Sequence, residues 1–157
     1  MTSVPLKFER LAKKGDHSDL RLHLGTFSHT CDSYYLVIDE SPTASRRLGA
    51  NLARLLEQWK DQVDELKSVG GTAYLPYDFS DQCTAWLRVT SADGRGAEVH
   101  AGWSLVEAWG IEPSNYVATA PEIKDFEPIE GAQIACSLDD LAQCIAMGAE
   151  AHRSSRY

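Results

Sequence analysis

Residues 41–71 read SPTASRRLGANLARLLEQWKDQVDELKSVGG and carry the strongest structural pattern of the chain. Ser41 can accept a hydrogen bond from a free amide at a helix start, and Pro42 suits the first helical position. The apolar residues that follow recur at steps of three and four, which places them on one helix face: Leu48, Leu52, Leu55, Leu56, Trp59, Val63 and Leu66. The closing Gly-Gly pair supplies the left-handed conformation that ends many helices. We therefore predict an amphipathic helix over residues 43–69.

Before this helix, two segments have strand patterns. In residues 20–24, leucine alternates with Arg21 and His23, which is typical of a strand with one buried face. Residues 34–38 read YYLVI, and this aromatic and β-branched run is the clearest candidate for a central strand. The mixed residues 5–15 fit a short strand or a single helical turn.

After the helix, strand patterns alternate with turn signals. Residues 72–75 begin an extended segment that lies at a sheet edge or ends at Pro76, because proline cannot donate to a ladder. The runs 83–90 and 97–103 flank an Asp-Gly turn, which predicts a hairpin. Three prolines interrupt residues 105–131, where we expect turns and one or two short strands.

The end of the chain has the features of a second helix. Ser137 and Asp140 resemble a capping box with Asp in place of Glu, and apolar residues follow at helical spacing. Strict alternation of strand and helix is absent. The pattern therefore predicts an α+β fold, in which one face of an antiparallel or mixed β-sheet packs against the helix over 43–69 plus a C-terminal helix. The length of 157 residues suits a single globular domain, 1–157, frayed at 1–5 and 153–157.

The negative charge is concentrated in the last third of the chain. Residues 105–157 hold 9 Asp and Glu against 3 Lys and Arg, whereas residues 1–104 hold 14 against 12. Nucleic acid is a poor partner for such a surface, because binding it relies on cationic groups. A basic protein would be attracted to it. The alternative is that the charge only keeps the protein soluble.

Neither a signal peptide nor a membrane span is evident in the sequence. The four cysteines, Cys31, Cys83, Cys136 and Cys144, form no CxxC pair, and reduced thiols in a cytoplasmic protein are the simplest interpretation. His29 and Cys31 have spacing that could suit a metal, but no second close pair completes a tetrahedral set. We therefore expect no metal and no cofactor.

The densest polar and aromatic group is the segment 77–82, interpreted as a loop that includes Tyr77, Asp78 and Asp81. Loops of this composition bind ligands in some proteins, whereas in many others Asp and Ser only cap the turn. Trp103, Glu107 and Trp109 fall where the predicted hairpin gives way to irregular chain. Large aromatic residues at such a place contribute to interfaces or pack in the core. These six residues are the predicted binding residues, and no catalytic residue is assigned.

Common motifs for nucleotide binding, metalloproteases and hydrolases are absent from the sequence. The first hypothesis is accordingly a non-catalytic acidic domain that binds another protein, such as a small cytoplasmic inhibitor or immunity-type protein for a basic partner. The alternative is a small enzyme of an unrecognised class that uses Asp78, Asp81 or His100 as acid–base residues. A third possibility is a homo-oligomer built through the sheet edge near Pro76.

Overall fold

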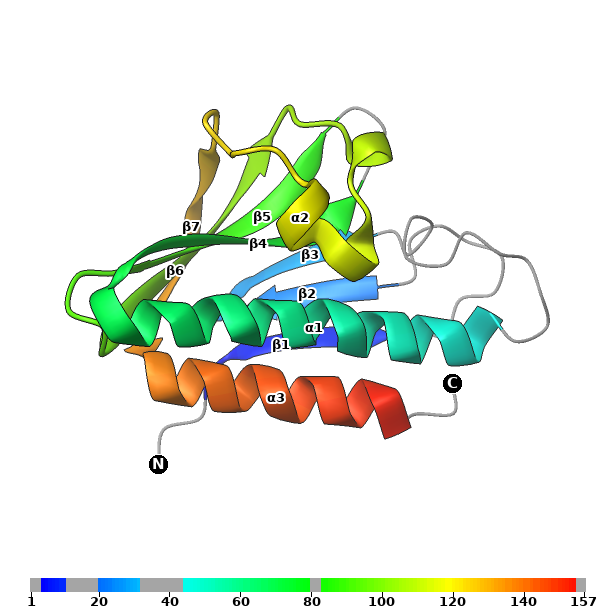
Figure 1. The fold of residues 1–157 in the computed structure, drawn as a ribbon, viewed down its shortest axis with the longest axis horizontal. Helices are drawn as coiled ribbons and strands as arrows, with labels where there is room; N and C mark the ends of the chain where they lie inside the picture. The colour runs from blue at the N-terminus through cyan, green and yellow to red at the C-terminus, as the bar shows by residue number, and fades with distance from the viewer. Residues whose placement is uncertain (1–3, 11–19, 32–43, 80–82, 155–157) are drawn as a thin grey trace.

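The computed structural model describes residues 4–10, 20–31, 44–79 and 83–154 (Figure 1). Within these ranges, the side chains of residues 44–48, Trp109, Ser114 and Ser154 are not described. The predicted strand over 34–38 and the predicted helix start at Ser41-Pro42 lie outside the described residues.

A three-stranded antiparallel sheet forms the first layer. It consists of β1 (Leu6–Arg10), β2 (Leu20–Leu24) and β3 (Phe27–Cys31), in the order β1-β2-β3. All three leucines of β2 are fully buried, which confirms the strand predicted there. Gly25 adopts a φ of 62° and turns the chain from β2 into β3, a strand that the sequence pattern did not predict.

A four-stranded antiparallel sheet contains β4 (Gly71–Phe79), β5 (Thr84–Ser91), β6 (Gly96–Ser104) and β7 (Glu127–Ser137), in that order. Because β4 is an edge strand, Pro76 lies where its missing N–H is tolerated, as predicted. The predicted hairpin is β5–β6, and the Asp93 carboxylate accepts hydrogen bonds from the backbone amides of Arg95 and Gly96 in its turn. Two elements differ from the predictions: residues 77–79 belong to β4 rather than to a loop, and β7 spans 11 residues.

Two long helices lie side by side along one side of the molecule (Figure 1). They are α1 (Ala44–Val69) and α3 (Leu138–Ser154), so both helix predictions are confirmed. The apolar stripe of α1 from Leu52 to Leu66 is buried. Gly70 ends the helix with a φ of 74°, and its amide donates to the Leu66 carbonyl at 2.8 Å.

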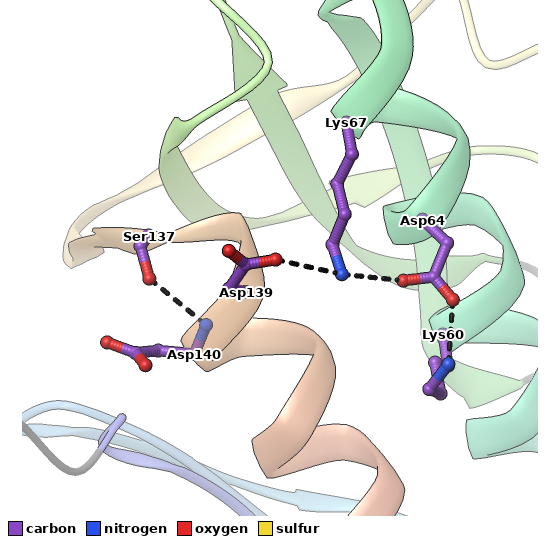
Figure 2. A network of polar contacts seen from close by, with 6 residues as sticks. All are labelled: Lys60, Asp64, Lys67, Ser137, Asp139 and Asp140. Atoms are coloured by element: carbon purple, nitrogen blue, oxygen red, sulfur yellow. Dashed lines mark hydrogen bonds and ion pairs between the residues drawn. The ribbon is translucent and has the colours of Figure 1, made fainter. Parts of the chain in front are cut away.

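Polar contacts join the facing ends of these helices (Figure 2). The Lys67 ammonium group lies 3.0 Å from Asp64 on its own helix and 3.1 Å from Asp139 on α3. The Ser137 hydroxyl accepts a hydrogen bond from the Asp140 amide at 3.0 Å, which satisfies one of the free donors at the start of α3.

Short helical turns connect β6 to β7. They are η1 (Ala108–Gly110), η2 (Pro113–Asn115) and α2 (Tyr116–Thr119). The buried Tyr116 ring packs against Trp86 of β5, and its hydroxyl donates to Gln62 of α1. The buried apolar side chains of both sheets, both long helices and this connection form one continuous core. None of the helices in the described part of the chain is long and apolar enough to cross a membrane.

Candidate functional site

A group of polar and aromatic side chains lies where the two sheets meet. Residues paired across an antiparallel ladder point to the same face of the sheet. His29 pairs with Leu22, and Cys31 pairs with Leu20, so both project from the buried face of the first sheet. Asp78 faces them from the edge strand of the second sheet, through its contact with His29.

A β-bulge places two consecutive residues of β4 against the same histidine. The register shifts between Pro76 and Asp78, which leaves Tyr77 as the extra residue. In a regular strand, neighbouring side chains point to opposite faces, whereas a bulge changes the direction of a side chain. As a result, the Tyr77 ring packs edge-on against His29, and the Asp78 carboxylate bonds to the same imidazole.

The contacts of His29 define the geometry of the group. Its Nε2 atom lies 2.9 Å from Oδ2 of Asp78, and the two side chains are 19% and 12% exposed. The ring of Trp103 is 4.9 Å from the imidazole, centroid to centroid, and that of Tyr77 is 5.6 Å away. The imidazole is therefore surrounded by aromatic rings and still reaches solvent at one edge.

Cys31 adds a thiol to this pair. The residue is only 2% exposed, and its Sγ atom lies 3.5 Å from the backbone carbonyl oxygen of His29. One nitrogen of His29, the sulfur of Cys31 and one carboxylate oxygen of Asp78 all lie within 4.8 Å of one another. We call these three residues the His-Cys-Asp cluster.

The hydroxyl group of Tyr77 is buried and, within the described part of the chain, has no hydrogen-bond partner. Such a buried hydroxyl costs about 1–3 kcal/mol if it stays unsatisfied. Burial raises the pKa of Tyr77, and negative charge on Cys31 and Asp78 raises it further. The charges of the His-Cys-Asp cluster therefore affect the ionisation of this hydroxyl.

The structure brings three of the six predicted binding residues together. Tyr77, Asp78 and Trp103 meet around His29, whereas Glu107 is exposed on the chain that follows β6. Asp81 lies outside the described residues. The backbone of Trp109 belongs to η1, and its side chain is outside the described part.

His100 is separate from Asp78. On β5, His100 pairs with Arg88, whereas Asp78 pairs with Ala85. Arg88 and Ala85 are separated by an odd number of residues along the strand, so His100 and Asp78 lie on opposite faces of the sheet. The His100 ring bonds to the Ile129 carbonyl oxygen at 3.0 Å. The structure therefore brings together Asp78 and His29 instead of Asp78 and His100.

Sequence reasoning did not connect His29 and Cys31 with Asp78. The signal that could have placed the first two is the alternation in residues 27–31, FSHTC, directly after the turn at Gly25. Its even spacing puts His29 and Cys31 on the same face of a strand. No local pattern indicates that Asp78 packs against this face, because the contact joins two different sheets.

A second feature is the concentration of carboxylates on the chain that follows β6, from the connection with its short helical turns into the first residues of β7. We call residues 105–130 the acidic segment. All six of its carboxylate residues are exposed: Glu107, Glu112, Glu122, Asp125, Glu127 and Glu130. Lys124 is its single cationic residue. Leu105 and Val117 of the same segment are 78% and 56% exposed, so the acidic groups are accompanied by accessible apolar surface.

A pocket of about 950 Å³ lies between β1 and α3, with Trp59 of α1 also in its wall. Cys144 and His152 line it, and both bond to backbone carbonyl oxygens of β1. Neither Asp78 nor His100 lines this pocket. It is therefore distinct from the His-Cys-Asp cluster and from the acid–base residues considered in the sequence.

No protein-family model matches the chain, and no match was found among curated proteins or among solved structures.

Proposed function

We propose that this protein is a non-catalytic domain that binds another protein through a basic surface of the partner, as a small inhibitor or immunity-type protein would do. The observation that carries the proposal is the acidic segment, in which six exposed carboxylates stand against one lysine. Negative charges gathered on one segment attract a positively charged partner and accelerate its association.

The apolar residues of the acidic segment support the same function. Leu105 precedes the first carboxylate, and Val117 belongs to α2. Interfaces between proteins combine an apolar centre with a polar rim. Leu105 and Val117 are thus candidate anchors, and Glu107, one of the predicted binding residues, lies close to the first of them in sequence.

The test compares two charge-reversal variants of the full chain. Glu112→Lys with Glu127→Lys alters the acidic segment, whereas Glu65→Lys with Glu98→Lys produces the same change in net charge on α1 and β6, where both residues are also exposed. Immobilised native protein and both variants are used to capture partners from the native lysate at low and moderate salt. A far-ultraviolet circular dichroism spectrum of each variant checks folding.

We expect native protein and the control variant to retain the same basic partner, and the acidic-segment variant to lose it. Retention should also fall as salt increases, because the attraction between exposed charges is screened. Equal recovery by both variants would refute the role of the acidic segment. Recovery of no protein by the native chain would refute partner binding under these conditions.

The alternative of a small enzyme has one supporting observation, the bond between His29 and Asp78. A His–carboxylate pair orients an imidazole for acid–base work. The thiol that completes the cluster belongs to a residue only 2% exposed, however, which restricts the access of a substrate to its sulfur. Binding of a small ion meets this restriction more easily.

A further inference from the structure

We propose that His29, Cys31 and Asp78 bind a divalent zinc ion between the two sheets. The three side chains provide one nitrogen, one sulfur and one oxygen donor. These are the donor types that zinc takes in proteins, whereas calcium and magnesium prefer oxygen alone. The mixed donor set therefore selects a zinc-like ion.

The distances in the His-Cys-Asp cluster are close to those that tetrahedral coordination requires. Zinc–ligand bonds of about 2.0–2.3 Å place neighbouring ligand atoms roughly 3.5 Å apart. The nitrogen of His29 and the oxygen of Asp78 are 2.9 Å apart, and all three donor atoms lie within 4.8 Å. Small side-chain rotations would bring the three donors from these distances to the required spacing.

The surroundings leave a place for a fourth ligand. Three protein ligands and an open position are the arrangement found in sites where zinc holds water or substrate. His29 and Asp78 are partly exposed, which gives an ion a path from solvent. The hydroxyl of Tyr77, which has no hydrogen-bond partner among the described residues, belongs to the ring that packs against His29 and is a candidate to bond a group held at the fourth position.

A second histidine–carboxylate pair shows what distinguishes the cluster. His23 lies 2.9 Å from Glu9, and these side chains are 36% and 40% exposed on the opposite face of the first sheet. The described residues provide no third donor beside that pair. The pair is an ordinary surface contact, whereas at His29 a buried thiol completes the donor set.

Zinc binding should also release a proton. The thiol of Cys31 must lose its proton for the sulfur to act as a zinc ligand, so binding releases that proton to the buffer. Because the ion would hold β3 to β4, it should bind the folded chain in preference to the unfolded chain. The melting temperature should therefore rise with zinc concentration.

The experiment titrates the chelator-treated full chain with zinc chloride in competition with a chromophoric chelator, and separately with cobalt chloride. Cluster variants are His29→Gln, Cys31→Ser and Asp78→Asn. Control variants are His23→Gln, from the exposed pair, and Cys136→Ser, whose half-buried residue lies on β7. Circular dichroism verifies the fold of each variant.

We expect one zinc ion per native chain, unchanged in both controls and weakened about tenfold or more in each cluster variant, since even outer partners of metal ligands contribute this much. Cobalt should give a thiolate charge-transfer band with native protein and no such band with Cys31→Ser. Absence of this band in the native chain would overturn the proposal, as would equal zinc affinity in the Asp78→Asn variant. If a cluster variant fails to fold, absence of the cobalt band in the native chain still overturns the proposal.

Discussion

The Nε2 atom of His152 lies 3.1 Å from the carbonyl oxygen of Phe8, so the last turns of α3 bond to the outer edge of β1. Cys144, earlier on the same helix, makes a similar contact: its sulfur lies 3.2 Å from the carbonyl oxygen of Leu6. Exposed sheet edges carry unpaired backbone groups that invite association. Here side chains of the C-terminal helix cover the edge and satisfy its carbonyl groups.

This contact predicts a loss of stability in mild acid. Burial lowers the pKa of His152 below its ordinary value of 6.5, and the nearby charges of Arg10 and Lys7 lower it further. Below pH 6.5, the unfolded chain therefore binds a proton that the folded chain resists, and the stability falls as pH decreases towards the lowered pKa. Urea unfolding at about pH 7.5 and about pH 5.5 should show the decrease.

His152→Gln provides the comparison for this prediction. Glutamine can donate to the Phe8 carbonyl oxygen and does not titrate, so the variant should lose less stability between the two pH values than native protein does. An unchanged difference between pH 7.5 and pH 5.5 in this variant would assign the acid sensitivity to other groups.

Glycine substitutions separate backbone strain from steric clash. Gly70 has a φ of 74°, and an added Cβ would lie 2.7 Å from the carbonyl oxygen of Ser91. Gly131 has a φ of 82° with no atom near such a Cβ, and Gly110 has neither restriction. Gly131→Ala should cost about 1–2 kcal/mol for the left-handed conformation alone. Gly70→Ala should cost more, whereas Gly110→Ala should stay within about 0.5 kcal/mol.

Chemical denaturation of the three alanine variants measures this order. If Gly70→Ala were no more destabilising than Gly131→Ala, the close approach of Gly70 to the end of β5 would not matter for stability. A large loss of stability in Gly110→Ala would contradict the expectation that this glycine has neither backbone strain nor a close neighbour.

The elements predicted correctly from the sequence are those whose pattern is local. The helix over 44–69 and the strand over 20–24 each repeat their apolar residues with the period of the structure they form. The His-Cys-Asp cluster has no such period. It depends on the packing of one sheet against another and on the bulge that directs Asp78 towards His29. Neither feature has a pattern among residues that are neighbours in the sequence.

The region 105–131 was harder to predict for a different reason. Strand β7 carries mostly exposed residues on a sheet edge, so it lacks the apolar alternation that identifies a strand. Its pairing depends on the backbone of β6, which is supplied by a separate part of the sequence. The predicted binding residue Glu107 was identified from composition, which does not indicate its neighbours in space.

Trp59 should be sensitive to substitution because it links α1 to an edge strand. The side chain is 1% exposed, and its indole N–H donates to the Pro76 carbonyl oxygen at 3.1 Å. Trp59→Phe removes the donor to this buried carbonyl and part of the packed ring. We expect a destabilisation of roughly 1–3 kcal/mol in urea unfolding. A change below about 0.5 kcal/mol would mean that solvent or another donor replaces the indole.

The start of α3 allows a capping bond and a surface ion pair to be compared in one place. Ser137→Ala removes the acceptor for the Asp140 amide and should destabilise the protein by about 1 kcal/mol. Lys67→Met removes the contact with Asp139, whose side chain is 88% exposed, and should cost less than about 1 kcal/mol. The effect of Lys67→Met should also diminish in high salt, whereas that of Ser137→Ala should persist, because only the ion pair is screened. Urea unfolding of both variants at two salt concentrations tests this, and an equal salt dependence would show that the distinction is wrong.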